Sequence, residues 1–492
     1  MSPGRLLSLV SAAFLLALAF ILALRGLTAF GAWAPLSAGT WIYLCLWYLV
    51  FYVGLVLPAR PSRQGGGLAP GTWVIVMSAA AICGAAIMTY DFAIVRGYGF
   101  SISVNDARIM QVEQASRGYV GSWLGGIGRL LISALLVAWI VATIQWRRTG
   151  WGALVVLLGA TAAVVAYQSK FEGGRFFLLY LVMVAGFGAM LYIAGDITKD
   201  DRIRLDRLRW RHAAPLLLVA AMFAVSMVYS TYTFSSRGED VAKQIDALIA
   251  QGQVGDGGTG PASATGTDHE AEAGADPATE PGTGIPRPNE KLAEIEAAKE
   301  AGASPYALSY LQFASYFDID TSKMQDLETF SGREYTLAMG WIYATHGLSE
   351  LDRILRKREF VQAGGFYQFS QVAQVLSKLA GTDLRYDLRN LPNVGTYVTL
   401  PGAMYVDFGY VGGLLSALLL GYLFRWSFVQ SVQGSFAGSL FAPLVFVLLA
   451  AAPAVSLMSG VWPSFMWGGL IMAVDHMFRR GRSARAADSN SA

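Results

Sequence analysis

The sequence predicts an all-α polytopic integral membrane protein with about ten transmembrane helices and one large loop outside the membrane. Of its 492 residues, 54% are hydrophobic and only 14% are charged. Soluble domains carry roughly 25% charged residues. A helix that crosses a bilayer needs about 20 mostly apolar residues, and ten windows of the chain approach that requirement. These features exclude an ordinary soluble enzyme, a disordered chain and a secreted disulfide scaffold.

The ten apolar windows are predicted to be membrane-spanning helices. They cover approximately residues 6–24, 40–57, 72–90, 123–144, 151–167, 176–194, 214–231, 401–424, 436–452 and 461–478. The first window is longer than the apolar part of a signal peptide, and nine more follow it, so we expect it to be a retained helix.

The basic residues between the windows predict the orientation of the chain. With the N-terminus placed inside, the inner segments hold 16 basic residues and the short outer loops hold six. This is the bias of the positive-inside rule. The pattern predicts ten spans with both termini in the cytoplasm. The formal net charge of +3 is too small to indicate a nucleic-acid partner.

The chain divides into five predicted parts. Residues 1–231 hold the first seven spans, residues 232–304 form an acidic Gly- and Ala-rich insertion, residues 305–400 form a helical cap, residues 401–478 hold the last three spans and residues 479–492 form a basic tail. The insertion has too few aromatic and branched apolar residues to bury a core, so we expect it to be disordered. The cap is expected to rest on the outer membrane face.

Charged residues follow the fifth span in a very short outer turn. Lys170 and Glu172 lie in this turn, and Arg175 opens the next span. A helix N-terminus with an arginine suits a diphosphate group, because guanidinium binds phosphate oxygens bidentately. The alternative is that these side chains extend to lipid headgroups.

Further basic residues are candidates for binding an anionic group. Arg129 follows a glycine-rich stretch near the outer end of the fourth window, Arg333 is isolated in the cap, and Arg353 and Arg356 belong to the run LDRILRKREF. The alternative for Arg129 is the membrane interface, and the alternative for the run is a solvated helix face.

His346 is the only histidine in the predicted cap. A histidine can act as a general base near neutral pH, although a lone histidine is more often structural. The two cysteines, Cys45 and Cys83, lie in apolar windows. The sequence shows neither a metal-ligand set nor a nucleotide motif, so no cofactor is predicted.

The segment NVGTYVTLPGAMYVDFGYVGG leads into the eighth window. Asn393, Thr396, Tyr405 and Asp407 precede or open a glycine-spaced helix, and the small residues predict close helix packing. Asp407 can cap the helix or position a sugar hydroxyl.

This segment resembles the closing signature of bacterial oligosaccharide repeat-unit polymerases, the Wzy-type or O-antigen polymerases. In that family an Asn–x–x–Thr stretch leads through an aromatic run to Asp-Phe-Gly at the outer end of a late helix. A second resemblance is Gly173-Gly174-Arg175, which opens a middle helix, with Gly186 eleven residues after the arginine. The residues that match the closing signature are Asn393, Thr396, Tyr405, Asp407, Phe408, Gly409 and Gly412 or Gly413.

The resemblance implies an inverting, metal-independent membrane glycosyltransferase with a GT-C-like fold. Such an enzyme joins polyprenyl-diphosphate-linked oligosaccharides on the periplasmic face of the inner membrane. The implied partners are that lipid-linked substrate, the bilayer, a chain-length regulator and a flippase. This chain departs from the family in having ten predicted spans where many members have more, and in its insertion.

The reaction implied by the resemblance needs cations for the leaving diphosphate and a base for the acceptor hydroxyl. Arg175 is the first candidate cation, and the candidate bases are His346, Glu172, Glu334 and Asp407. The substrate-binding candidates are Arg129, Lys170, Arg333, Arg353, Arg356, Asn393, Thr396 and Tyr405. The alternatives are an O-antigen ligase-like transferase and a polysaccharide or lipid-linked sugar transporter.

Overall fold

A computed structural model describes most of the chain. The described residues are 3–27, 29–59, 69–100, 102, 110, 122–172, 176–199, 202–203, 212–229, 297–322, 324, 326–357, 361–384, 386, 390–391, 398–432 and 435–491. Most of the predicted disordered insertion, residues 232–296, lies outside this set. Residues 297–300, at its end, are helical.

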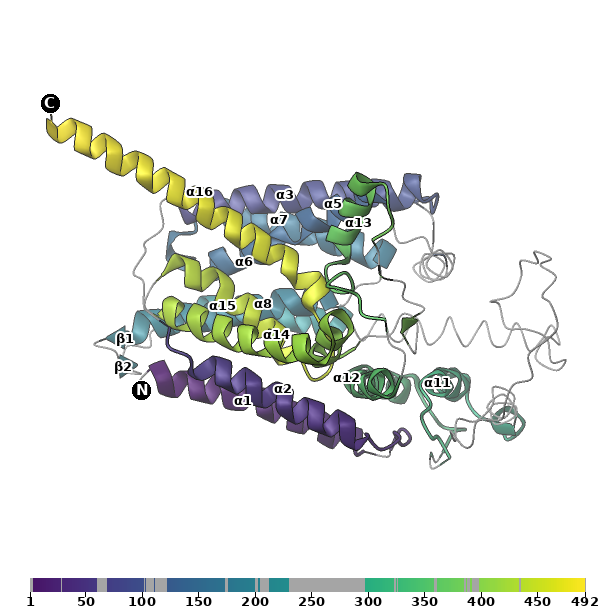
Figure 1. The fold of residues 1–492 in the computed structure, drawn as a ribbon. Helices are drawn as coiled ribbons and strands as arrows, with labels where there is room; N and C mark the ends of the chain where they lie inside the picture. Colours follow the sequence, from purple (N-terminus) through teal and green to yellow (C-terminus); the bar gives the residue numbers. More distant parts are fainter. Residues whose placement is uncertain are drawn as a thin grey trace. The chain divides into compact units, whose positions relative to one another are not determined.

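The described chain is built of helices, with one two-residue antiparallel ladder (Figure 1). The helices of the first half are α1 (Pro3–Arg25), α2 (Ala38–Val56), α3 (Pro70–Tyr90), η1 (Asp91–Val95), α5 (Trp123–Ile132), α6 (Ala134–Ile144), η2 (Trp146–Arg148), α7 (Trp151–Tyr167), η3 (Gln168–Glu172) and α8 (Phe176–Ile197). The ladder pairs β1 (Thr198–Lys199) with β2 (Arg202–Ile203). The later helices are α11 (Pro305–Tyr316), α12 (Gly332–Arg356), α13 (Ser370–Ala380), α14 (Leu400–Val432), α15 (Phe436–Ala451) and α16 (Met458–Ser491).

The helices have the length and composition of a multi-pass membrane protein. Among the described residues, six apolar segments are long enough to cross a bilayer, namely Ala38–Val56, Pro70–Val95, Trp123–Ile144, Trp151–Phe171, Phe177–Asp196 and Leu400–Val432. Three shorter apolar helices, Phe14–Arg25, Ala213–Tyr229 and Gly438–Ala451, fall on three other predicted windows. The last predicted window, residues 461–478, lies within α16. The all-helical class is therefore confirmed, the six long apolar helices are consistent with a multi-pass membrane protein, and the number of spans stays a prediction.

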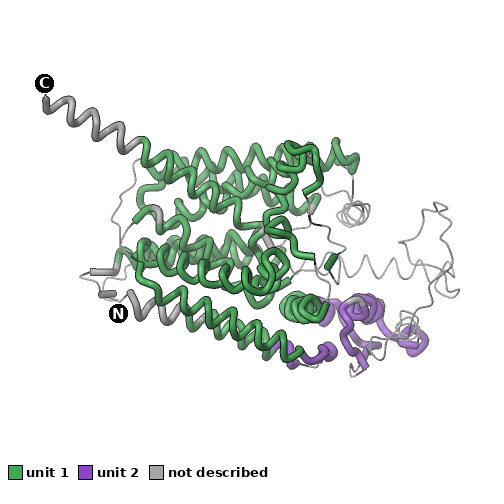
Figure 2. Tube along the Cα trace, in the orientation of Figure 1, with its two compact units in different colours: residues 1–23, 36–230, 343–492 green, residues 24–35, 231–342 purple. Residues whose placement is uncertain are grey.

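The chain forms two compact units (Figure 2). Unit 1 consists of residues 1–23, 36–230 and 343–492, and unit 2 consists of residues 24–35 and 231–342. The boundary between residues 342 and 343 falls inside the predicted cap and inside α12. The first part of α12 therefore belongs to unit 2 and its second part to unit 1.

Glycines allow the helices of unit 1 to approach closely. A Cβ atom added at Gly421 of α14 would lie 2.1 Å from the Phe51 carbonyl oxygen of α2. A Cβ atom at Gly84 of α3 would lie 2.7 Å from the Ile132 backbone nitrogen of α5. The close packing expected for the glycine-spaced helix after Asp407 is therefore confirmed at Gly421, because any side chain there would overlap backbone atoms.

One end of unit 1 collects several helix termini, and we call it the α13 end. The pairs Phe92–Tyr167 and Gly125–Asp91 bring together the ends of α3 and α7 and the start of α5. The Leu400 amide donates to the Ala452 carbonyl at 3.0 Å, which joins the start of α14 to the end of α15. Contacts of α13 with α5 and with Trp462 of α16 add that helix to the same end.

Unit 2 is held together by contacts between residues 24–35 and the α11 region. The Tyr310 hydroxyl donates to the Phe30 carbonyl, and Ala32 and Asp320 exchange two backbone hydrogen bonds of 2.8 and 3.0 Å. Trp341 Nε1 donates to the Leu24 carbonyl at 2.6 Å. Burial raises the pKa of the Tyr310 phenol, so this group stays protonated as a donor.

Candidate functional site

Asp407, in the Asp-Phe-Gly string, binds the loop that precedes α13. Its carboxylate is almost fully buried, with the residue only 1% exposed. Oδ1 accepts a hydrogen bond from the Tyr367 amide at 3.0 Å, and Oδ2 accepts one from the Gln368 amide at 3.2 Å. A carboxylate with both oxygens on backbone donors fixes the path of the chain that supplies them. We call the contacts between residues 361–369 and the start of α14 the Asp407 clamp.

Gly409 interrupts α14, and this interruption frees backbone carbonyls that take part in the Asp407 clamp. Its φ of 67° and ψ of −168° belong to a region open essentially to glycine. The interruption frees carbonyls that a continuous helix would use. The Val406 and Asp407 carbonyls instead accept from the Ala363 and Gly364 amides, each at 2.9 Å. The loop therefore pairs with α14 where the helix bends.

The Gln368 side chain connects the clamp to the chain between α15 and α16. Its Nε2 donates to Met404 Sδ at 3.3 Å, and its Oε1 accepts from the Ser456 hydroxyl at 3.1 Å. The Ser456 amide donates to the Val398 carbonyl at 2.7 Å. The α15–α16 connection is thus tied to the start of α14 by both backbone and side chain.

His346 lies on α12 next to the same connection. It is 1% exposed, and its ring makes an edge contact with the Tyr343 ring at 6.1 Å between centroids. A Cβ atom at the adjacent Gly347 would lie 2.2 Å from the Ala454 carbonyl oxygen. The structure therefore brings His346 and Asp407, two predicted catalytic residues, to chain segments that pack on residues 452–457.

A second cluster surrounds Asp91 at the end of α3. Arg96 Nε and Nη2 lie 2.8 and 2.7 Å from Asp91 Oδ2, and the Ser122 hydroxyl donates to Asp91 Oδ1. The Asp91 and Arg96 side chains are 0% and 7% exposed. The Arg96 guanidinium lies over the Phe92 ring, 4.1 Å from its centroid. We call this group the Asp91 cluster.

Two π-helical turns shape this second cluster. η1 follows α3 and η3 follows α7, and π-helical turns are frequent at functional sites. The Phe92 ring of η1 lies 5.7 Å from the Phe171 ring of η3. Lys170, also in η3, donates from Nζ to the Ile102 carbonyl at 2.7 Å. The packed turns therefore place Arg96 and Lys170 on neighbouring connections at the α13 end.

The glycines before Arg129 have a packing role in this cluster. A Cβ atom at Gly125 would lie 2.9 Å from Asp91 Oδ2 and 3.1 Å from Arg96 Nη2. A glycine at this position lets the start of α5 approach the ion pair. Arg129 itself is exposed on α5.

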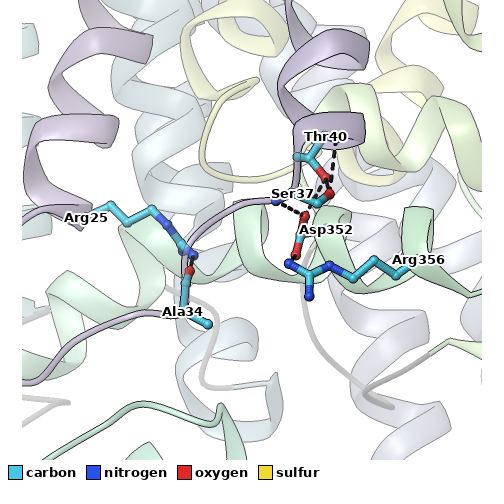
Figure 3. A network of polar contacts seen from close by, with 6 residues as sticks. All are labelled: Arg25, Ala34, Ser37, Thr40, Asp352 and Arg356. Carbon is cyan, nitrogen blue, oxygen red and sulfur yellow. Dashed lines mark hydrogen bonds and ion pairs between the residues drawn. The ribbon is translucent and has the colours of Figure 1, made fainter. Parts of the chain in front are cut away.

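Acidic residues of α12 form ion pairs with basic residues of the same helix. Asp352 Oδ1 accepts from the Ser37 amide at 2.7 Å and from the Thr40 hydroxyl at 2.6 Å, and Oδ2 lies 2.5 Å from Arg356 Nη2 (Figure 3). Arg353 Nη1 lies 2.7 Å from Oε1 of the buried Glu350. Burial alone would raise the pKa of Asp352, but the hydrogen bonds from Ser37 and Thr40 and the charge of Arg356 lower it below its ordinary value.

Several predicted site residues lie outside the described chain. Arg175, Asn393 and Thr396 are among them, and only the backbone of Glu172 is described. Arg333 is exposed in unit 2. Tyr405 is half-buried, and its ring lies 5.7 Å from the Tyr43 ring of α2.

Asp91, Arg96, Ser122 and Gln368 were not among the residues predicted from the sequence. One available signal was the stretch TYDFAIVRGY, in which an acid and a base flank the end of an apolar window. Ionisable residues at that depth are costly and are candidates for function.

Comparisons with known proteins identify no relative. No family model, no curated protein and no solved structure matches this chain.

Proposed function

We propose that this protein is a membrane glycosyltransferase that polymerises polyprenyl-diphosphate-linked oligosaccharide repeat units into a surface polysaccharide. One observation carries the proposal. At the α13 end of unit 1, Lys170 lies in the short connection between α7 and α8, and the Asp-Phe-Gly string lies near the start of α14, where Asp407 is bonded to residues 361–369. A transferase of this kind needs cations for its leaving diphosphate and a rigid wall for its sugar.

The proposed reaction transfers the growing chain to a new lipid-linked unit. The acceptor hydroxyl oxygen attacks the anomeric carbon of the donor, the bond from that carbon to the lipid diphosphate breaks, and the configuration inverts. A base takes the hydroxyl proton. We assign Arg175 to the leaving diphosphate, with Lys170 in the same short connection as a second contact.

The base is assigned to His346 or Glu172. Asp407 is less suited to proton transfer, because both of its oxygens accept backbone N–H groups. We therefore give Asp407 the role of positioning residues 361–369. The remaining binding residues are those named from the sequence in unit 1, namely Arg129, Arg353, Arg356, Asn393, Thr396 and Tyr405. Arg333, in unit 2, stays a prediction from the sequence.

The proposal includes the finer topology. The chain has ten spans in the bacterial inner membrane, both termini are cytoplasmic, and the fold is GT-C-like. The α13 end then faces the periplasm, where a flippase delivers the substrate and a chain-length regulator acts. The positive-inside bias of the sequence supports this orientation.

The deciding experiment uses the purified protein in lipid nanodiscs with a polyprenyl-diphosphate-linked repeat unit. Longer lipid-linked chains are expected. Transfer to a different acceptor would replace the polymerase with a ligase-like transferase, and the absence of any transfer would favour a transporter.

Arg175 is tested in the same assay. Arg175→Ala is expected to abolish polymer formation at normal protein level and membrane insertion, and Arg175→Lys to restore it only in part because the bidentate fork is lost. Arg148→Ala is the matched control, because this exposed arginine lies in η2, which joins the end of α6 to the start of α7, whereas the end of α7 lies at the α13 end. Full-length polymer from Arg175→Ala would defeat the assignment of that residue.

A further inference from the structure

The short helix α13 packs with its polar side inward. Gln371 is 6% exposed, and its Oε1 accepts a hydrogen bond from Trp462 Nε1 at 2.9 Å. Gln374 lies toward α5, where its Oε1 would be 3.4 Å from a Cβ atom at Gly126. The Ser377 hydroxyl donates to the Ala373 carbonyl and accepts from the Leu384 amide.

The opposite side of α13 is apolar and faces outward. Leu379 is 78% exposed and Leu376 is 39% exposed, whereas Ala373 on the inner side is fully buried. Val372 and Val375 flank the two leucines, and together they form the stripe i, i+3, i+4, i+7 of one helix face. In a water-soluble helix this stripe would face the core and the glutamines would face solvent.

The outward face of α13 adjoins other exposed apolar residues. α13 contacts α5, whose first residue, Trp123, is 53% exposed. Tyr90 and Ile94, where α3 ends beside α5, are each 54% exposed. Aromatic residues at this position are typical of the interface between acyl chains and headgroups.

The charge of α13 agrees with a lipid environment. Lys378 is its only ionisable residue and is exposed. It follows Gln374 by four positions and Val375 by three, at the border between the two faces, where a lysine can extend its ammonium group to lipid phosphates while its stem lies along the acyl chains. Figure 1 shows α13 crossing the direction of α3 and α5 rather than running along it.

We infer that α13 is an interfacial membrane helix. Its apolar face enters the acyl chains of the bilayer and consists of Val372, Val375, Leu376 and Leu379, while its glutamine face packs against α5 and α16. The occupant of the apolar face is lipid. This inference does not depend on the proposed reaction, because it follows from the inverted pattern of α13 and its continuity with the membrane-facing surface.

The test measures the environment of single nitroxide labels in proteoliposomes. Cys45 and Cys83 are first replaced by alanine, and a cysteine is then introduced by Leu379→Cys or Leu376→Cys. Leu419→Cys on α14, where the leucine is 66% exposed, is the matched lipid-facing control. Glu328→Cys, at an exposed residue of unit 2, is the water-facing control.

Collisions of each label with oxygen, which partitions into acyl chains, are compared with collisions with a water-soluble nickel chelate. The oxygen-to-nickel ratio at residues 376 and 379 is expected to exceed that at residue 328 several-fold and to stay below that at residue 419, because an interfacial helix lies at a shallower depth than a spanning helix. A ratio equal to that at residue 328 would overturn the inference. Low collision rates with both reagents that rise when the protein is diluted in lipid would also overturn it, because a second protein copy would then cover the face.

Discussion

Asp91 and Asp407 are two buried carboxylates at the same end of unit 1, and their partners differ. Asp91 is paired with the guanidinium of Arg96 and accepts the Ser122 hydroxyl. Asp407 is bonded to neutral donors, among them the backbone amides of Tyr367 and Gln368. The first carboxylate fixes the position of a charged side chain, and the second fixes the path of a loop.

This difference separates two ways of building a site. An ion pair balances its own charge, so removing one member leaves the other charge buried without compensation. A carboxylate on backbone donors leaves only neutral N–H groups behind when it is removed, and water can satisfy some of them. The two acids should therefore respond differently to the same substitution.

The largest expected effect is that of Asp91→Ala. Because the Arg96 side chain is 7% exposed, the variant takes the Asp91 carboxylate away from a buried guanidinium and should lose about 3–5 kcal/mol of stability. The double variant Asp91→Ala with Arg96→Met should be more stable than Asp91→Ala alone. Thermal unfolding of the purified protein in detergent measures both. Additive losses from the two substitutions would show that the ion pair is not a coupled unit.

Asp407→Ala is expected to have the next largest effect. The variant leaves the Tyr367 and Gln368 amides without their acceptor, at a cost of about 1–3 kcal/mol for each group that water does not reach. Hydrogen exchange of peptides covering residues 361–369 should accelerate, while exchange in α2 should not change. Asp407→Asn is the matched variant, since it keeps the shape and one acceptor oxygen and should give a smaller change. Unchanged exchange in the loop would contradict the clamp.

Gly409→Ala tests the bend that the clamp uses. An alanine at a φ of 67° and a ψ of −168° is strained, and its Cβ would lie 2.2 Å from Gln362 Nε2. A loss of about 1–3 kcal/mol is expected. Gly469→Ala in α16 is the control, because no atom outside the helix lies within 4 Å of the Cβ that it adds. That control should be neutral or slightly stabilising. Equal stability of the two variants would mean that the bend straightens without cost.

The apolar helices and their close packing were predictable from the sequence, because both depend on residues that are near one another in the chain. Apolar windows predict membrane-spanning helices because bilayer thickness fixes helix length, and the glycine spacing predicted close packing of α14 without identifying α2 as its partner. The periodicity of α13 predicted a helix. It did not show which face is turned inward, because in a membrane protein the apolar face can point to either side.

The Asp91 cluster was not predictable because it depends on an irregular turn. In a regular α-helix, residues five apart are separated by roughly 140° around the axis and do not face each other. In η1 the Arg96 amide donates to the Asp91 carbonyl at 2.9 Å, and this wider turn brings the two side chains together. The Asp407 clamp was missed for another reason, since its partners lie about 40 positions away in the chain and meet only in the tertiary structure.

The smallest expected effect concerns Asp352, whose partners combine those of the two buried acids: a backbone amide, a hydroxyl and an arginine. Its lowered pKa means that the unfolded chain takes up the proton first as the pH falls. The stabilisation is therefore complete above the unfolded pKa of about 3.9 and is lost as the pH falls through the lower pKa of the folded state. Wild type should unfold at a higher temperature than Asp352→Asn at pH 7, and this difference in unfolding temperature should narrow below about pH 4.

Glu334→Gln is the control for the same measurement at an exposed carboxyl. The pKa of Glu334 is also lowered, by hydrogen bonds from Ser331. A gap for Asp352→Asn that stays constant with pH would show that the Ser37, Thr40 and Arg356 contacts do not favour the ionised carboxylate.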